Sequence, residues 1–233
     1  ALAGRVVLVP GGAGGLGAAI CALLVQDGAI PVVGYRSNTE YIPGEILNDY
    51  GEVMVDMRTM AFMGFLEVAR NLRTVLSAER MLKKSIALRK PDTVLLIDYP
   101  GFNLRFARVA KEAGVAVFYY VSPQVWAWGR GRVPKIARRV DKMLVLFDFE
   151  EPIYREAGLD VVFTGHPLKD TVRPSQSRTE FFRSLHLDPE KPTLALLPGS
   201  RNQEVQRLLP AMIGAVRLLK RDIPGLQAVL AAA

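Results

Sequence analysis

The residues best suited to chemistry lie directly after predicted strands. Asp98 follows the apolar residues 93–97, and Arg201 follows the apolar residues 193–197 through a proline–glycine turn. A carboxylate at the carboxyl end of a parallel strand can act as general base for a hydroxyl, and it is equally suited to cap the next helix. An arginine in the first turn of a helix can bind a phosphate, or it can simply be a surface arginine.

The segment around Arg201 has the composition of an anion site. Gly199 ends the turn, and Ser200 can cap a helix together with Gln203 three residues later. A helix that begins in this way carries a partial positive charge at its N-terminus, which favours an anionic group. Residues 194–204 therefore predict a cradle for a diphosphate, with an ordinary strand–turn–helix as the alternative.

Polar and aromatic side chains follow the predicted strand 115–121. Ser122, Gln124 and Trp126 alternate there, and Trp128 comes two residues later. Indole rings at a strand end can stack on a sugar face or contact an acyl chain, whereas two core tryptophans are the simpler alternative. The basic run between residues 130 and 139 indicates a solvated helix face or a surface for phosphate or anionic lipid.

A second apolar segment combines methionine and phenylalanine. These side chains adapt to acyl chains or to a membrane interface, and they are equally typical of a helix start in a protein core. The acyl or membrane interpretation concerns Met60, Phe62, Met63, Phe65 and Leu66.

The glycines of residues 11–17 follow the first predicted strand. Such a loop allows the backbone to approach a pyrophosphate, and it resembles the opening of short-chain dehydrogenases. Residues 35–38 would suit a 2′-phosphate, as in members of that family that prefer NADP. The Tyr-x-x-x-Lys pair of the family is absent from the sequence, so an NAD(P)-binding oxidoreductase is the alternative hypothesis and not the first.

Composition narrows the function class. The chain has 233 residues, a formal net charge of +7, one cysteine and two histidines. A closed zinc site and disulfides are therefore not expected, and no apolar run approaches the length of a membrane span. The positive charge suggests an anionic partner.

The order of elements predicts βαβ units with parallel strands. Strands are expected over 5–9, 30–34, 93–97, 115–121, 142–146, 161–164, 193–197 and 227–230. The last predicted helix runs to about residue 219, with a break or restart at Pro210. We expect an N-terminal Rossmann-like domain over 1–166 with an atypical glycine-rich start over 1–40, a linker over 167–178, and part of a second domain over 179–233.

Several motifs in order carry a family resemblance. They are Met63–Val68, Ile97–Asn103, Tyr120–Trp128, Thr164–Pro167, and Leu196–Arg201 with Glu204. From about Gly51 to the end, the sequence resembles lipid-A-disaccharide synthase. That resemblance implies an α/β fold of the glycosyltransferase B type with two Rossmann-like domains. It also implies work at the cytoplasmic face of the inner membrane in Gram-negative bacteria.

The resemblance implies a reaction and its residues. UDP-2,3-diacylglucosamine would be joined to 2,3-diacylglucosamine 1-phosphate through a β-1,6 bond with inversion and release of UDP, without a metal or other cofactor. Asp98 would take the proton of the acceptor 6-hydroxyl, and Arg201 would neutralise the departing diphosphate. The remaining substrate-binding residues would be Ser122, Gln124, Trp126, Gly199, Ser200, Glu204 and Asn103, although Asn103 by itself is typical of a capping or loop residue.

Two departures from the family pattern lead to further expectations. The family begins with a Gly-Glu-x-Ser-Gly-Asp loop, where this chain has the glycines of residues 11–17. Most of the second domain is not in the sequence, so we expect this chain alone to transfer weakly or not at all. A non-catalytic fragment that binds nucleotide sugar or lipid is therefore a third hypothesis. Nucleic acid is not an expected partner, and a homodimer is compatible with the sequence.

Overall fold

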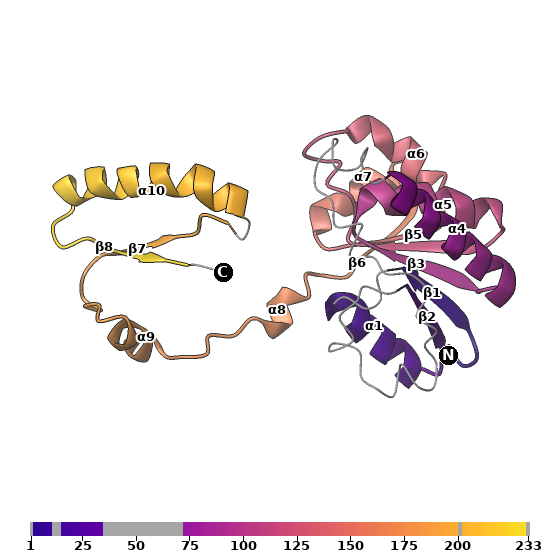
Figure 1. Cartoon of the computed structure of the whole chain (residues 1–233), viewed down its shortest axis with the longest axis horizontal. Coiled ribbons are helices and arrows are strands. Elements are labelled where there is room, and N and C mark those ends of the chain that lie inside the picture. Colours follow the sequence, from indigo (N-terminus) through magenta and orange to yellow (C-terminus); the bar gives the residue numbers. More distant parts are fainter. Residues whose placement is uncertain (1, 11–14, 35–71, 200–201, 232–233) are drawn as a thin grey trace. The chain divides into compact units, whose positions relative to one another are not determined.

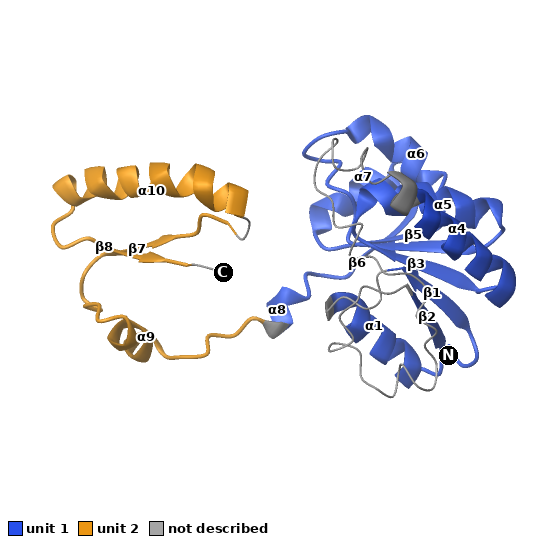
Figure 2. Ribbon diagram, in the orientation of Figure 1, with its two compact units in different colours: residues 1–170 blue, residues 171–233 orange. Residues whose placement is uncertain are grey.

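The protein is described here by a computed structural model. It covers residues 2–10, 15–34, 72–199 and 202–231 (Figure 1). The chain divides into two compact units, Ala1–Asp170 and Thr171–Ala233 (Figure 2). Each unit is built of parallel βα elements, as the alternation of apolar runs and helical patterns predicts.

Unit 1 is organised around a six-stranded parallel sheet in the order β2-β1-β3-β4-β5-β6. Its strands are short apolar runs, which suits a sheet with both faces covered by helices. The strands are β1 Val6–Pro10, β2 Ile30–Gly34, β3 Thr93–Ile97, β4 Ala116–Tyr120, β5 Lys142–Val145 and β6 Asp160–Phe163. Each lies within about a residue of its predicted position.

Successive residues of these strands face opposite layers of the core. Leu8, Val94 and Leu96 pack in the larger cluster, with side chains from α4 (Leu72–Arg89), α5 (Pro100–Glu112), α6 (Val133–Ala137) and α7 (Glu151–Arg155). Val9 and Leu95 pack with α1 (Gly15–Gln26) on the other face. Figure 1 shows α1 on one side of the sheet and α4–α7 on the other.

Short helical turns complete unit 1. They are η3 (Arg130–Arg132), η4 (Asp148–Glu150) and α8 (Leu168–Thr171). The helix α8 falls inside the segment 167–178 that the sequence predicts to be a linker, and the boundary between the two units falls at its last residue.

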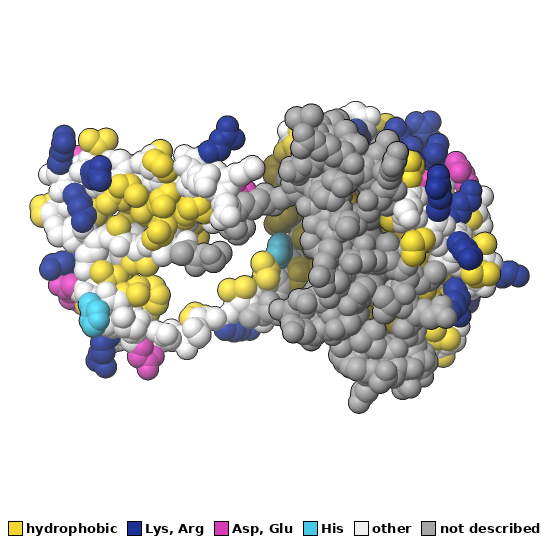
Figure 3. Space-filling view, viewed as in Figure 1, with side chains coloured by type: hydrophobic (Ala, Val, Ile, Leu, Met, Phe, Trp, Pro, Cys, Tyr) yellow, Lys and Arg dark blue, Asp and Glu magenta, His cyan; other side chains and the backbone are white. Residues whose placement is uncertain are grey.

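Unit 2 is a βαβ arrangement preceded by a capped helix. Helix α9 (Arg178–Ser184) begins with the predicted capping box, in which Ser177 and Glu180 bond each other's backbone N–H groups. Strands β7 (Thr193–Leu196) and β8 (Gln227–Leu230) are parallel, and α10 (Asn202–Asp222) connects them. Figure 3 shows hydrophobic side chains gathered along the side of α10 that faces the strands.

The predicted break at Pro210 is wrong. Helix α10 is continuous over 21 residues with Pro210 inside it. A proline costs an interior helix one hydrogen bond, but most helical stability in proteins comes from packing of an apolar face. Val216 of α10 is buried in that packing, so tertiary contact outweighs the local penalty.

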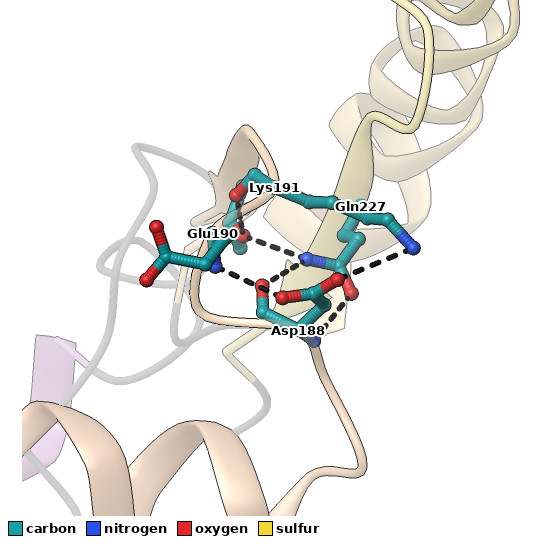
Figure 4. A network of polar contacts seen from close by, with 5 residues as sticks. Asp188, Glu190, Lys191 and Gln227 are labelled. Atoms are coloured by element: carbon teal, nitrogen blue, oxygen red, sulfur yellow. Dashed lines mark hydrogen bonds and ion pairs between the residues drawn. The ribbon is translucent and has the colours of Figure 1, made fainter.

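A glutamine, the first residue of β8, joins this strand to the turn between α9 and β7. The side-chain amide of Gln227 donates to the Asp188 carbonyl oxygen over 2.7 Å, and its oxygen accepts from the Asp188 N–H over 2.9 Å (Figure 4). The Asp188 carboxylate accepts from the Glu190 N–H over 3.0 Å and lies 3.4 Å from the Lys191 ammonium. These bonds order the turn between α9 and β7.

Candidate functional site

The strand order places Asp98 at the expected binding edge of unit 1. The chain runs from β1 outward to β2 and then returns to β3 on the other side of β1. In open α/β sheets, ligands bind outside the carboxyl ends of the strands where the order reverses in this way. Asp98 is the first residue after β3, so it lies at that reversal.

The backbone at Asp98 has an uncommon conformation. Asp98 has φ 50°, and Tyr99 has φ 44° and ψ 62°, so two consecutive residues other than glycine are left-handed. Tyr99 and not Asp98 is the cap residue of α5, and no side chain bonds there as a cap. The alternative that Asp98 caps the helix is therefore wrong. Its exposed carboxylate has no hydrogen bond or ion pair to any residue that the structure describes.

Asn103 lies inside α5 and not in a loop, and it is 2% exposed. Its amide nitrogen donates to the Ile97 carbonyl oxygen over 3.0 Å and to the Asp98 carbonyl oxygen over 2.7 Å. Its own side-chain oxygen is buried and has no partner among the described residues. The amide nitrogen therefore binds the end of β3, and the predicted contact of Asn103 with substrate stays a prediction.

Main-chain bonds join the strand ends into one edge. The Asp98 N–H donates to the Tyr120 carbonyl oxygen over 2.9 Å, and the Val121 N–H donates to that of Leu144 over 3.2 Å. The Thr164 N–H and the Thr164 hydroxyl each donate to the Val145 carbonyl oxygen over 3.0 Å. Val121 has φ 65°, a marked strain for a β-branched residue.

Ser122 is buried behind this edge. Its hydroxyl donates to Glu150 Oε1 over 2.6 Å, while Glu150 Oε2 accepts from the Phe147 N–H over 3.2 Å. Glu150 is 3% exposed, which is unusual for a carboxylate unless it is hydrogen-bonded. In this structure Ser122 joins the loop after β4 to the loop after β5, and its predicted contact with substrate stays a prediction.

Gln124 and Trp126 are the exposed part of the same loop. Trp126 is 47% exposed and meets Phe149 edge to face at a ring distance of 5.4 Å. Phe149 stacks on Phe147 at 5.4 Å, and Phe147 lies 5.8 Å from the His166 ring. We call these four rings, Trp126, Phe149, Phe147 and His166, the aromatic row.

The sequence interpretation missed Phe147, Phe149 and Glu150. They follow β5, as Ser122 and Trp126 follow β4, so their place directly after an apolar run was the available signal. It also missed Trp128's partner: the Arg132 guanidinium lies over the Trp128 ring at 5.3 Å. Both tryptophans are exposed, so the core alternative for them is wrong.

In unit 2, only part of the predicted diphosphate cradle is described. Gly199 has φ 109°, and an added Cβ there would lie 2.5 Å from the Glu204 carboxylate. Glu204 is in the first turn of α10, where a negative charge favours the helix dipole. Ser200 and Arg201 lie outside the described residues.

Other predicted residues are also outside the described part. These are Met60, Phe62, Met63, Phe65 and Leu66, together with the glycines of residues 11–14. Within the described ranges, no group of three or more potential metal ligands comes together. None of the described helices is both long and apolar enough to cross a bilayer.

The fold is of the glycosyltransferase B type, with mixed α/β units and parallel sheets. The UDP-GlcNAc 2-epimerase from Neisseria meningitidis has a similar fold, with a TM-score of 0.59 and 12% identity over 98% of this chain and 66% of that chain. At that identity, the likeness concerns the fold alone.

Sequence comparison identifies the family. Residues 42–233 match the pattern of the lipid-A-disaccharide synthetase family, and this chain belongs to that family. The lipid-A-disaccharide synthase of Syntrophus aciditrophicus is 52% identical over 179 residues, which are 77% of this chain and 47% of the relative.

A second relative also matches the N-terminal part. The lipid-A-disaccharide synthase of Trichlorobacter lovleyi is 45% identical over 230 residues, which are 97% of this chain and 58% of the relative. Its match therefore extends well before residue 42, into the segment that by itself resembles a dehydrogenase. The chain spans about half the length of the curated relatives that it matches.

Proposed function

We propose that this chain carries the acceptor side and part of the donor side of a lipid A glycosyltransferase. The proposed reaction joins UDP-2,3-diacylglucosamine to 2,3-diacylglucosamine 1-phosphate through a β-1,6 bond. Membership of the family supports the reaction class. The observation that carries the site is the exposed Asp98 carboxylate at the reversal of the strand order.

In this proposal, Asp98 acts as general base. The acceptor 6-hydroxyl oxygen attacks the anomeric carbon of the donor and transfers its proton to the Asp98 carboxylate. The bond between the anomeric carbon and the diphosphate oxygen breaks, and its electron pair leaves with UDP. Arg201 and the backbone N–H groups at the start of α10 would neutralise the charge that develops on the diphosphate.

The charge, the aromatic rings and the fold of the chain support the substrate class. The net charge of +7 suits two phosphorylated sugars. The aromatic row offers ring faces and edges at the carboxyl ends of β4, β5 and β6, which suit a sugar face or an acyl chain. The solved Neisseria epimerase of similar fold is bound to UDP-GlcNAc, which favours a nucleotide sugar here as well.

The remaining assignments are part of the same proposal. Gln124, Trp126, Gly199 and Glu204 would contact substrate, while Ser122 and Asn103 would support the loops that do. The segment with Met60, Phe62 and Met63 would contact acyl chains or the inner leaflet, at the cytoplasmic face of the inner membrane. Sedimentation with anionic vesicles tests the membrane contact: replacing Phe62 and Met63 by serine should reduce binding, and unchanged binding would contradict it.

The central experiment measures UDP release. It uses this chain and a hybrid protein, in which residues 1–233 are followed by the C-terminal remainder of the Trichlorobacter lovleyi relative. In the hybrid, Asp98→Asn should lower kcat by at least about a hundredfold, the usual contribution of a general base. Arg201→Ala should have an effect of similar size, whereas Arg80→Ala on the exposed side of α4 should have none.

Three outcomes would contradict the proposal. Full activity of both Asp98→Asn and Arg201→Ala would remove the assigned roles. Tight retention of NADPH with no binding of UDP-sugar would favour the oxidoreductase alternative. Binding of UDP-sugar by this chain without turnover, in a hybrid that is also inactive, would favour the non-catalytic alternative.

A further inference from the structure

The conformation at the end of β3 needs an explanation. Asp98 and Tyr99 both have positive φ, at 50° and 44°. Residues other than glycine adopt the left-handed backbone region at a cost in free energy. Such strain persists only where the surrounding structure enforces it. Glycine at either position would remove the cost, yet the chain has an aspartate and a tyrosine there.

Two buried donors enforce the conformation. The Asp98 carbonyl oxygen accepts from the Tyr119 hydroxyl over 2.6 Å and from the Asn103 amide over 2.7 Å. The Asp98 N–H is also bonded, to the Tyr120 carbonyl oxygen. The main chain of Asp98 is therefore held on both sides, while its carboxylate is exposed.

Both donors are well placed to be rigid. Tyr119 is fully buried on β4 and Asn103 is 2% exposed in the first turns of α5, so neither side chain has freedom to turn away. Burial raises the pKa of Tyr119 well above its ordinary value, so the phenol keeps its proton and stays a donor. The Tyr119 hydroxyl therefore remains a hydrogen-bond donor at neutral pH.

The side-chain oxygen of Asn103 has no hydrogen-bond partner among the described residues, so an amide is not the side chain that packing alone would favour at this position. A buried amide with one unsatisfied end is costly, and an aliphatic side chain of similar size would avoid that cost. What the asparagine provides and an aliphatic residue cannot is a donor to the carbonyl oxygens of Ile97 and Asp98.

We propose that Asn103 and Tyr119 are positioning residues that hold the Asp98 backbone in its left-handed conformation and so fix the direction in which its carboxylate leaves the sheet. This proposal rests on the proposed function, in which that carboxylate is the general base. Neither residue touches the reacting atoms. Their effect passes through the Asp98 main chain, so it depends on the presence of the carboxylate.

The test compares substitutions that remove one donor each. Tyr119→Phe removes only the hydroxyl, and Asn103→Leu removes both the amide donor and the side-chain oxygen. Tyr154→Phe is the matched control, because Tyr154 is also fully buried and its hydroxyl also donates to a main-chain carbonyl oxygen, that of Pro123 over 3.0 Å. All variants are made in the hybrid protein, and correct folding is checked by circular dichroism.

Misplacement of a catalytic group by about 1 Å can cost about a hundredfold in rate, so Tyr119→Phe and Asn103→Leu should each lower kcat about tenfold to a hundredfold with little change in KM. In an Asp98→Asn background, the same substitutions should change the residual rate less than about twofold, because coupled residues are not additive. Tyr154→Phe should leave the pH profile of kcat unchanged, whereas Tyr119→Phe and Asn103→Leu should shift it.

The outcomes separate the two proposals. If Asp98→Asn retains activity, the proposed function fails. If Asp98→Asn is inactive but Tyr119→Phe and Asn103→Leu behave like Tyr154→Phe, the proposed function stands and the positioning role is wrong. A crystal structure of the Asn103→Leu variant of this chain tests the positioning role independently of activity. The Asp98 backbone should leave its left-handed conformation, and an unchanged left-handed Asp98 would overturn the inference.

Discussion

The hydroxyl of Ser122 donates to Glu150 Oε1 over 2.6 Å, and both side chains are buried. This bond links the loops after β4 and β5, which carry Trp126 and Phe149 of the aromatic row. Because a buried carboxylate that loses a donor keeps its desolvation cost, the pair should be sensitive to removal of either partner.

Ser122→Ala should therefore lower the free energy of unfolding of unit 1 by about 1–3 kcal/mol. Ser77→Ala is the control, because Ser77 is exposed on α4, where alanine has the higher helix propensity. Urea unfolding followed by tryptophan fluorescence measures both. Equal midpoints for the two variants would show that the buried bond contributes nothing.

Gly199 should tolerate no side chain. Gly199→Ala combines a left-handed φ of 109° with a Cβ 2.5 Å from the Glu204 carboxylate, whereas Gly225→Ala has a φ of 75° and only ordinary contact with Lys191 at 3.4 Å. Gly225→Ala should cost about 1–2 kcal/mol for its conformation, and Gly199→Ala should cost more. Hydrogen exchange of β7 and β8 amides compares them, and an equal loss of protection would argue against crowding by Glu204.

Unit 2 should lose stability in acid. The backbone N–H of Glu190 and then the Lys191 ammonium hold the pKa of Asp188 below its ordinary value. The folded unit thus binds the proton of Asp188 less readily than the unfolded chain does. The stabilisation that the Asp188 carboxylate contributes is complete above its ordinary pKa of about 4. It disappears as the pH falls through the lowered pKa of the folded protein.

Asp188→Asn should remove the contribution of this carboxyl group to the pH dependence of the stability of unit 2. Thermal unfolding between pH 5 and about 2, followed by circular dichroism, makes the comparison. Wild-type protein and the variant should differ most at pH 5 and converge toward pH 2. A constant difference across this range would rule out titration of Asp188 as the cause.

Cys21 should be chemically inert in the folded protein. It is fully buried against β1 and β3, and burial raises the pKa of its thiol to about 12. The thiolate that reacts with a disulfide reagent is therefore nearly absent at neutral pH. Labelling should proceed only in denaturant, and rapid labelling of native protein would contradict the packing of α1 on the sheet.

Much of the frame was open to prediction from sequence. Strand β3 and its neighbours are apolar on both faces, which is typical of a covered parallel sheet, and Asp98 could be placed at a strand end on that basis alone. The predicted capping box at Ser177 and Glu180 is confirmed. It could be predicted because both of its hydrogen bonds form within four consecutive residues.

The details of the site depend on contacts between distant residues. Nothing near Asn103 in sequence indicates that it bonds the Asp98 carbonyl, because that oxygen is reachable only after Asp98 and Tyr99 turn left-handed. From the sequence alone, Glu150 is indistinguishable from a solvated surface carboxylate. Its bond with Ser122 forms only because β5 pairs with β4 in the folded sheet. The predicted helix break at Pro210 is wrong for the same reason, because packing of α10 on β7 and β8 stabilises the continuous helix.

The bonds between strand ends also bear on how a ligand would bind. Asp98, Val121 and Thr164 each donate their N–H to the neighbouring strand, so the loops after β3, β4 and β6 begin in fixed positions. Their conformational freedom is given up when the sheet forms. A ligand that binds at this edge therefore contacts residues whose backbone is already ordered. Binding does not carry the entropic cost of ordering those residues.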